Sequence, residues 1–476
     1  MRAAGDNSGA NRSGSRIEAE LRSLVAGQPA GSRLPSVREL SRRHRAGPVT
    51  VQRIITRLER EGLLDAVPGN GTFVARRWAA PVPGDVSWQT VALGARAQPG
   101  DAMASLAALA PAGTLSLAAG YPDASLWPSA LLTAAAGRAA RGPGAWDRTP
   151  AQGLEALRAW FAADAGPGVH PDDVLVVPGG QAALTAAFRG LASPGDPVVV
   201  EAPSYVGAIE AARAAGLHPV PVPADGEGVL PDLLAAVLHV TGARLIYLQT
   251  RLANPVGATL GPERREAVLA LARSHGAFVI DDDFARDLDQ PGGPAPLLGA
   301  DPDGHVVYVR SLTKSTAPAL RIAGVVVRGP ALARLRNSRL TDDLFVSTML
   351  QETALAVVTA PGWSRHLARL RRSIDERRRA AADALAAVPG LELVHRPTGG
   401  FLLWLRLVDG TGRAVPPEAA READTVRRAR EAGVMVLSGR PGFCAEPDGT
   451  YLPISVAGIA SVDVPEAVAR LATALV

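Results

Sequence analysis

The residue of this sequence that most clearly carries chemistry is Lys314, the only lysine in the chain. Because Lys and Arg together number 50, the other 49 are arginine, which serves wherever a plain positive charge is enough. Arginine stays protonated at any accessible pH, whereas a lysine amine can lose its proton and condense with an aldehyde. The commonest protein use of such a lysine is to hold pyridoxal 5′-phosphate. Lys314 is therefore the predicted catalytic residue and the attachment point of that cofactor.

The residues around Lys314 argue against a surface lysine that survived by chance. Ser311 and Thr313 precede it and Arg321 follows it, directly after an apolar run at 305–309. Hydroxyl groups and a guanidinium at the end of a strand suit a phosphate ester. Ser311 and Arg321 are accordingly expected to bind the cofactor phosphate.

Polar motifs also follow three other apolar runs, where ligands of open α/β sheets bind. Gly180 and Gln181 open a predicted helix whose first N–H groups can hold a phosphate. Tyr205 offers a ring that stacks on a flat ligand, and Asn254 offers an amide to a phenolic oxygen. Each motif taken alone also fits an ordinary turn or core position, so the prediction depends on their recurrence.

Three consecutive acids, Asp281, Asp282 and Asp283, end the apolar run at 278–280. Carboxylates can bind a metal, but no histidine stands among them, and no metal site is predicted. A single buried carboxylate that faces a pyridine nitrogen is the preferred interpretation. It keeps that nitrogen protonated and the ring an electron sink.

The elements that must position these residues follow from the alternation of apolar runs and helical patterns. The strand-like runs lie at 174–177, 198–200, 245–248, 278–280, 306–309 and 324–327. Buried runs separated by helices predict an α/β fold with a mainly parallel sheet covered on both faces. The body, residues 113–476, thus divides into a large α/β part at about 140–335 and a smaller α+β part at about 360–476.

Length and charge indicate a second kind of function. A chain of 476 residues holds two or three domains. Residues 1–77, called the head, carry 14 arginines against 7 acids, or +7, which leaves −3 of the overall +4 for the rest. This asymmetry favours a nucleic-acid contact in the head. The single Cys444 argues against a disulfide framework and fits the cytoplasm, and neither a signal peptide nor a membrane span is expected.

Start signals in the head predict a helix-turn-helix followed by a two-stranded wing. Ser36 and Glu39 form a capping box for one helix, and Pro48 suits the first position of the next. Short strands at 63–65 and 72–74 flank a turn at Pro68-Gly69-Asn70-Gly71. The predicted domain covers 15–77, after a disordered tail at 1–14 and before a linker at 78–112 that contains a short helix near 102–109.

The segment LPSVRELSRRHRAGPVTVQRIITRLEREGLLDAVPGNGTFV resembles the winged helix-turn-helix of the GntR family of bacterial transcription regulators. The resemblance implies DNA contacts by Arg38, Thr50, Gln52 and Gly69, with Arg53 nearby. One departure is that Gly47-Pro48 stands where the family usually has Ser-Arg, so one habitual DNA-contacting arginine is missing.

In order, type and approximate spacing, the strand-end motifs of residues 113–476 resemble fold-type I pyridoxal-phosphate aminotransferases. Joined to a GntR head, the chain resembles the MocR subfamily of regulators, whose pattern the segments GYPDASLWP, APSYVGAIEAARAAG and SLTKSTAPALRIAG follow closely. The resemblance implies that Lys314 holds the cofactor, Asp282 pairs with its ring nitrogen, Tyr205 stacks on the ring and Asn254 bonds the ring oxygen. It also implies that the phosphate is surrounded by Gly180, Gln181, Ser311 and Arg321.

Two departures concern the substrate end of the expected site. Phe284 stands where the family has a tyrosine that bonds the ring oxygen. Pro453 stands where aminotransferases have an arginine that grips the substrate α-carboxylate. Arg251 or Arg440 is left as a possible substitute.

The sequence therefore predicts a cytoplasmic transcription regulator that binds pyridoxal phosphate. As a homodimer, it would place two heads on two half-sites of double-stranded operator DNA. A small effector, either pyridoxal phosphate itself or an amino compound, would act on the body. One alternative is a working aminotransferase whose head is incidental. Another is a DNA-binding protein that has lost the cofactor, which the retained Lys314 disfavours.

Overall fold

The computed structural model describes residues 8–75, 85–93 and 101–475. They belong to two compact units, of which the first ends at Ala97 and the second begins at Gln98. The predicted linker at 78–112 and its boundaries remain predictions, and residues 78–84 and 94–100 of it lie outside the described residues. One short helix that was not predicted, α4 (Trp88–Leu93), falls within it.

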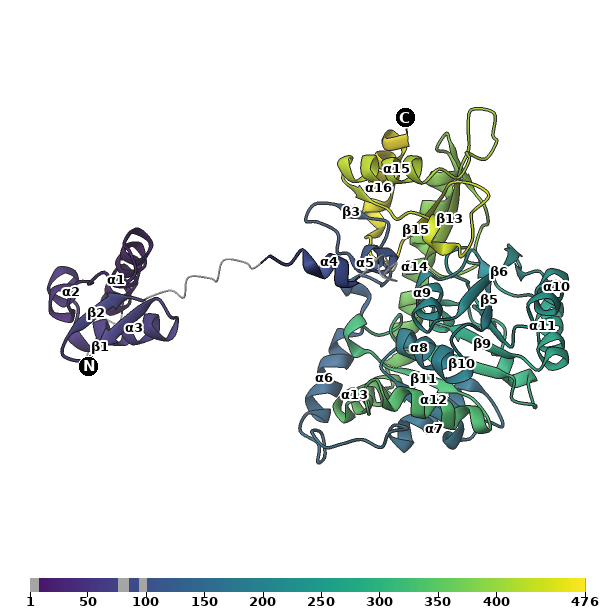
Figure 1. Cartoon of the computed structure of the whole chain (residues 1–476), viewed down its shortest axis with the longest axis horizontal. Coiled ribbons are helices and arrows are strands. Elements are labelled where there is room, and N and C mark those ends of the chain that lie inside the picture. Colours follow the sequence, from purple (N-terminus) through teal and green to yellow (C-terminus); the bar gives the residue numbers. More distant parts are fainter. Residues whose placement is uncertain (1–7, 76–84, 94–100, 476) are drawn as a thin grey trace. The chain divides into compact units, whose positions relative to one another are not determined.

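Residues 8–75, the described part of the head, form three helices and a two-stranded wing (Figure 1). The elements are α1 (Ser8–Gly27), α2 (Val37–His44), α3 (Pro48–Arg60), β1 (Leu64–Val67) and β2 (Gly71–Val74). The two strands are antiparallel. Apolar residues at helical spacing bring the three helices together around a core of Leu21, Leu40, Val51, Ile55 and Leu58. Helix α1 begins within the segment that was predicted as a tail.

The start signals predicted for the helix pair act largely as expected. The Ser36 hydroxyl accepts a hydrogen bond from the Glu39 backbone N–H at 3.2 Å, and Pro48 lies in the first turn of α3. The other half of the predicted capping box is not formed. The Glu39 carboxylate instead pairs with Arg43 at 2.7 Å, because an arginine one turn further along the helix competes for it.

An eight-stranded sheet forms the centre of the second unit. Its strands are β4 (Val174–Val177), β5 (Pro197–Ala202), β6 (His218–Asp225), β7 (Gly228–Val229), β8 (Leu245–Leu248), β9 (Phe278–Asp283), β10 (Val306–Ser311) and β11 (Ala323–Val326). Their spatial order is β4-β11-β10-β9-β8-β5-β6-β7, and only the pairs of β11 and the β6–β7 pair are antiparallel. The prediction of a mainly parallel sheet is confirmed. Strand β6 was missed because three prolines interrupt its pattern, which a strand near the sheet edge tolerates.

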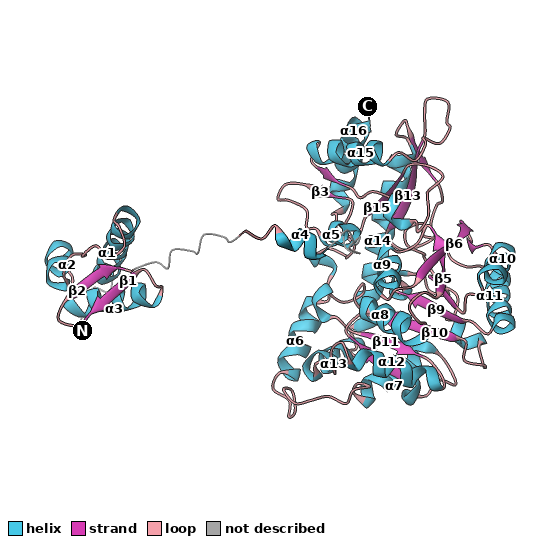
Figure 2. Ribbon diagram, viewed as in Figure 1, coloured by secondary structure: helices cyan, strands magenta, loops and turns pink. Residues whose placement is uncertain are grey.

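Helices cover both faces of this sheet, as Figure 2 shows. One face packs on α8 (Gly180–Leu191), α9 (Val206–Ala214) and α12 (Pro330–Leu340). The other packs on α7 (Glu155–Ala165), α10 (Pro231–Thr241), α11 (Pro262–His275) and α13 (Thr348–Val358), beside which lies α6 (Ser129–Ala139). Alternate residues of each strand enter the two cores, so the strands are buried on both sides.

The C-terminal part has its own core. Helix α14 (Trp363–Ala386) leads into the antiparallel sheet of β12 (Leu391–Leu393), β13 (Leu402–Leu407) and β15 (Tyr451–Ser455), with α15 (Ala419–Glu431) and α16 (Val464–Leu475) beside it. A separate strand, β14 (Val434–Met435), pairs with β3 (Leu115–Ser116). This pairing places the loop after β3 beside the C-terminal part, while α5 (Asp101–Ala107), which precedes β3, packs beside α9. No helix of the described residues is both long and apolar enough to cross a membrane.

Candidate functional site

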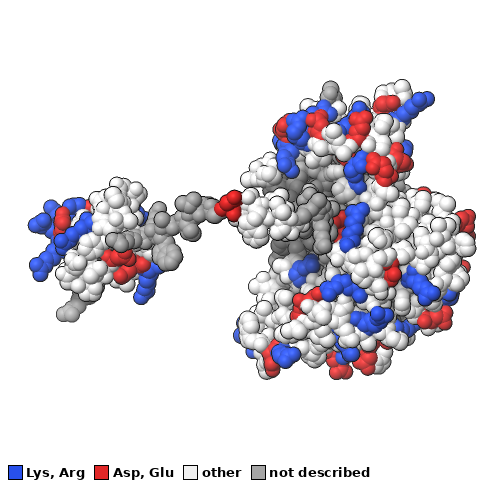
Figure 3. Space-filling model, in the orientation of Figure 1, with Lys and Arg blue, Asp and Glu red and all other residues white. Residues whose placement is uncertain are grey.

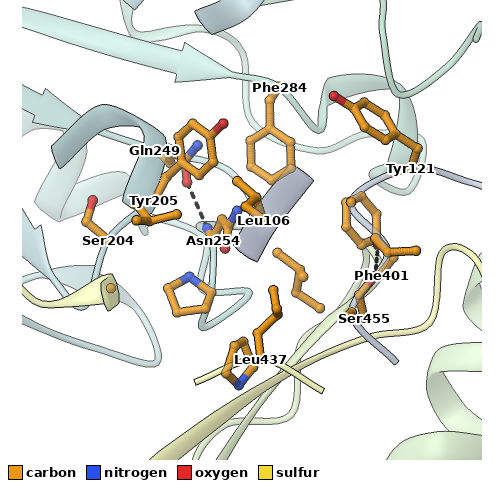
Figure 4. A pocket seen from close by; sticks show the side chains of 18 of the residues that line it. Leu106, Tyr121, Ser204, Tyr205, Gln249, Asn254, Phe284, Phe401, Leu437 and Ser455 are labelled. Carbon is orange, nitrogen blue, oxygen red and sulfur yellow. Dashed lines mark hydrogen bonds between the residues drawn. The ribbon is translucent and has the colours of Figure 1, made fainter. Parts of the chain in front are cut away.

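A cavity of about 510 Å³ lies in the second unit at the carboxyl ends of the parallel strands (Figure 4). Every residue predicted to hold the cofactor lines it: Gly180, Gln181, Tyr205, Asn254, Asp282, Ser311, Lys314 and Arg321. These residues come from segments up to 141 positions apart (321 − 180). The fold thus assembles all the predicted residues in one place, where their individual roles remain predictions.

The amine of Lys314 is held inside this cavity by the loop that follows β3. Its Nζ donates a hydrogen bond to the Gly120 carbonyl at 2.7 Å and lies 3.9 Å from the centre of the Tyr121 ring. Loss of water around the amine lowers the pKa of Lys314 from 10.5 to about 8. The charge of Arg321 lowers this pKa further, and the charge of Asp282 opposes the change. The amine is therefore much more readily deprotonated than an exposed lysine.

The three consecutive acids at the end of β9 have separate partners because strand side chains alternate between faces. Asp281 accepts hydrogen bonds from Thr250 and from the backbone, and Asp283 accepts them from Arg251 at 3.1 Å and from Tyr308 at 2.9 Å. Of the three, only Asp282 lines the cavity. Among the residues that the structure describes, no cluster of His, Cys, Asp or Glu could hold a metal ion.

Gln249, a residue that the sequence prediction missed, organises the wall beside Asp282. Its Nε2 donates to Asp282 Oδ2 at 2.8 Å, and its Oε1 accepts from the Asn254 backbone N–H at 2.8 Å (Figure 4). The Tyr247 hydroxyl also donates to Asp282, at 2.9 Å. Burial raises the pKa of Asp282 to about 6, and these two donors oppose that rise. The carboxylate is thus mainly ionised at neutral pH and ready for a cationic partner.

The opposite end of the cavity is built to hold an anion. Arg321 donates to the Pro178 carbonyl at 3.1 Å, and its guanidinium lies against Gly179, where an added Cβ would approach Nη2 to 2.6 Å. The glycine, with φ of +96°, leads directly into α8, whose first backbone N–H groups have no partner within the helix. Ser311 lies next to Gly180 at this helix start. A guanidinium, a hydroxyl and a helix N-terminus together suit a phosphate.

Tyr205 and Gln181 form the wall between these two ends. The Tyr205 hydroxyl donates to Gln181 Oε1 at 3.1 Å, and Gln181 Nε2 donates to the Gly207 carbonyl. Burial raises the pKa of Tyr205, so its phenol stays protonated. The buried Ser204 hydroxyl beside it has no hydrogen-bond partner among the described residues, which leaves one polar group for a ligand. Nothing in the sequence distinguished Ser204 from an ordinary loop serine.

The part of the cavity that would receive a substrate contains Pro453 and Phe284. Neither of the arginines that were left as substitutes lines this space. Arg251 is buried and paired with Asp283 at 3.1 Å and Asp289 at 2.5 Å. Arg440 pairs with Glu446 at 3.0 Å and donates to a backbone carbonyl at 2.9 Å. In this structure, therefore, neither arginine faces the cavity as a free cation.

Comparison with known proteins supports the assignment of this fold. Residues 115–471 match the family described as aminotransferase class I and II, and residues 14–74 match the gntR family of bacterial regulatory proteins. The chain belongs to the class I and II aminotransferases. The head of the chain is a GntR DNA-binding domain. The whole chain is a GntR-type regulator fused to an aminotransferase-like domain, as the resemblance to MocR proteins implied.

The most similar proteins include both enzymes and regulators. The chain is 33% identical over 370 residues to the 2-aminoadipate transaminase of Thermus thermophilus, covering 76% of this chain and 90% of that enzyme. It is 25% identical over 454 residues to the uncharacterized HTH-type transcriptional regulator YdfD of Bacillus subtilis, covering 93% and 92%. The crystal structure of LysN, an alpha-aminoadipate aminotransferase of Thermus thermophilus complexed with N-(5′-phosphopyridoxyl)-L-leucine, matches with a TM-score of 0.71 at 31% identity, covering 79% of this chain and 96% of that one.

Pyridoxal 5′-phosphate is the cofactor of class I and II aminotransferases, so the cofactor prediction is confirmed. The cavity of this family member fits the group: an amine, a carboxylate and an anion-binding end are arranged around one space. The residues that would hold it are Lys314 at the aldehyde, Asp282 at the ring nitrogen and Arg321 at the phosphate. When bound, the cofactor supplies an aldehyde carbon to primary amines and a ring that withdraws electrons.

The GntR head of this aminotransferase relative presents the predicted DNA-contacting residues at its surface. Arg38 on α2, Gln52 and Arg53 on α3 and Gly69 in the wing turn are exposed, while Thr50 is half-buried. Acidic residues of the head pair with Arg22, Arg43 and Arg57. In contrast, Arg38 and Arg53 form no ion pair with any described residue, which leaves both for phosphate contacts. Figure 3 shows arginine atoms gathered on the part of this unit that holds α2.

Proposed function

We propose that this GntR-type regulator senses a small molecule through pyridoxal phosphate at Lys314 and turns over little or no substrate. The observation that carries the proposal is that the cavity has the groups for the cofactor but, among the described residues that line it, lacks a cation for a substrate carboxylate. The groups for the cofactor are present, including an amine whose pKa is lowered to about 8, but no described residue at the substrate end offers a guanidinium. Transamination needs a substrate held in one orientation, and a bidentate arginine normally supplies much of that orientation.

The sensing unit is proposed to act on DNA as a homodimer in the cytoplasm. Support comes from the class of fold, whose members pair around their active sites, and from a head in which Arg38 and Arg53 are exposed and form no ion pair with a described residue. Two heads related by a two-fold axis suit two operator half-sites. The relatives named as HTH-type transcriptional regulators support the same reading.

Helix α5 is the proposed connection between ligand and head. Its residues Met103, Leu106 and Ala107 line the cavity, and it packs beside α9. In the sequence it is the first described element of the second unit, so it stands between the cavity and the segment that leads to the head. A ligand that fills the cavity contacts α5 directly. A change in the position of α5 is the proposed signal, which requires ligand affinity to differ between the two positions.

The test uses the purified full-length protein loaded with pyridoxal phosphate. It should absorb visible light, and reduction with borohydride should fix the cofactor on the peptide that contains Lys314. The Lys314→Ala variant, which removes the amine, should lose the fixed cofactor. A colourless protein that takes up no added pyridoxal phosphate overturns the proposal.

The second candidate function is catalysis by the same site. The similarity to the Thermus 2-aminoadipate transaminase and the presence of Lys314 and Asp282 favour it. Incubation with an amino-acid and keto-acid pair, with the new keto acid measured, separates the two functions. Under the sensing proposal, turnover stays far below the ~1–10³ s⁻¹ of ordinary enzymes. Turnover within that range would establish the aminotransferase instead.

A further inference from the structure

The substrate end of the cavity is an apolar compartment formed by five separate segments. It is lined by helix α5, the end of β9, β13 with the loop before it, the loop after β14, and β15. The apolar side chains among its lining residues are Met103, Leu106, Phe284, Phe401 and Leu437. Figure 4 shows Leu106, Phe284, Phe401 and Leu437 around one space. Such a wall stabilises a ligand by removing its apolar surface from water.

The charged groups of the cavity are all assigned to the cofactor. Among the described residues that line it, the cations are Lys314 and Arg321 and the acid is Asp282. The two serine hydroxyls at the apolar end already donate to protein acceptors: Ser455 to the Ala119 carbonyl and Ser438 to Glu422 at 2.7 Å. A carboxylate placed in this compartment would lose its water without gaining a cationic partner, which costs free energy.

We infer that the ligand sensed by this site is a primary amine with an apolar body and no carboxylate beside the amine. The inference rests on the proposed function, because the amine is the group that the cofactor aldehyde recognises. The apolar compartment accepts the rest of the molecule. The site then binds common α-amino acids weakly because of their carboxylate. This discrimination applies whatever side chain the amino acid carries.

The experiment compares 3-methylbutylamine with L-leucine, which differ only by the carboxylate. Full-length protein loaded with pyridoxal phosphate is titrated with each compound, and the visible absorbance of the cofactor and the melting temperature are followed. The amine should bind roughly ten- to a hundredfold more tightly, because the leucine carboxylate would leave water without a charge-assisted partner in the cavity. Leucine that binds as tightly as the amine, or more tightly, overturns the inference.

Two variants of one position provide the matched control. Pro453→Arg introduces a cation into the wall, whereas Pro453→Met introduces a side chain of similar length without charge. Pro453→Arg should reduce the preference for the amine by about tenfold or more, and Pro453→Met should keep it. An unchanged preference in a Pro453→Arg protein that still binds the cofactor counts against the inference.

The outcomes separate this inference from the proposed function. A protein that takes up no pyridoxal phosphate contradicts the proposed function itself. A coloured protein whose absorbance and melting temperature respond to neither compound overturns the ligand class alone, and leaves cofactor binding intact. Leucine as the better ligand would mean that a cation from outside the described residues, such as one from a second copy of this chain, completes the site.

Discussion

The lowered pKa of Lys314 predicts how fast the protein captures pyridoxal phosphate at neutral pH. Only the unprotonated amine attacks an aldehyde. A lysine with a pKa of 10.5 has roughly 0.03% of its amine free at pH 7, whereas a pKa of about 8 leaves roughly 9% free, about 300-fold more. The capture rate should therefore rise with pH and level off above about pH 8.

The informative perturbation is Asp282→Asn. The charge of Asp282 stabilises the Lys314 ammonium, so its removal should lower the lysine pKa below about 8. Since roughly 9% of the amine is already free at pH 7, capture at that pH can rise by at most about tenfold. The same change removes the partner of the ring nitrogen and should weaken retention of the cofactor. Faster capture with weaker retention is the expected result.

The assay mixes cofactor-free protein with pyridoxal phosphate between pH 6 and pH 10 and follows visible absorbance in stopped flow. N-acetyl-lysine amide, measured in parallel, corrects for the titration of pyridoxal phosphate itself. Tyr247→Phe is the control variant for measurements above pH 8: it removes a hydrogen bond to Asp282 but keeps the carboxyl group, whose pKa of about 6 should rise without this donor. A wild-type rate that still rises steeply above pH 9, or an Asp282→Asn profile displaced to higher pH, would refute the reasoning.

Three further predictions concern the head and α5. Arg38→Ala should weaken binding to all DNA sequences and reduce its salt dependence, whereas Gln52→Ala should reduce the difference between operator and unrelated DNA, both measurable by titration at several salt concentrations. Leu106→Ala should weaken binding of an apolar amine but leave uptake of the cofactor unchanged. The control is Leu109→Ala, at a position that is 92% exposed, which should change neither. Equal effects of the two substitutions would contradict the role given to α5. Ser36→Ala should lower the free energy of unfolding of the head by about 1 kcal/mol in a denaturant titration, because α2 loses its N-terminal cap; an unchanged midpoint would argue against that cap.

Features with a local signature could be predicted from the sequence. Lys314 could be identified as a functional residue because it is the only lysine beside 49 arginines. Strands β4 and β8 have the bounds that their apolar runs predict, because four consecutive buried residues leave little ambiguity. Ser36 and Pro48 mark helix starts through hydrogen bonding and fixed φ, which depend on neighbours only a few residues away.

Features that depend on distant segments were decided by the tertiary structure. Alternation along β9 separates Asp282 from its two neighbours, but only the packing of the sheet determines which of its faces meets the cavity. Gly120 reaches Lys314 across 194 positions because β3 pairs with β14, two residues long and without a clear pattern. Arg251 was a candidate ligand in the sequence and is a buried ion-pair partner in the fold. The physical reason is that periodicity specifies elements, whereas a site forms from side chains that only the packing of those elements brings together.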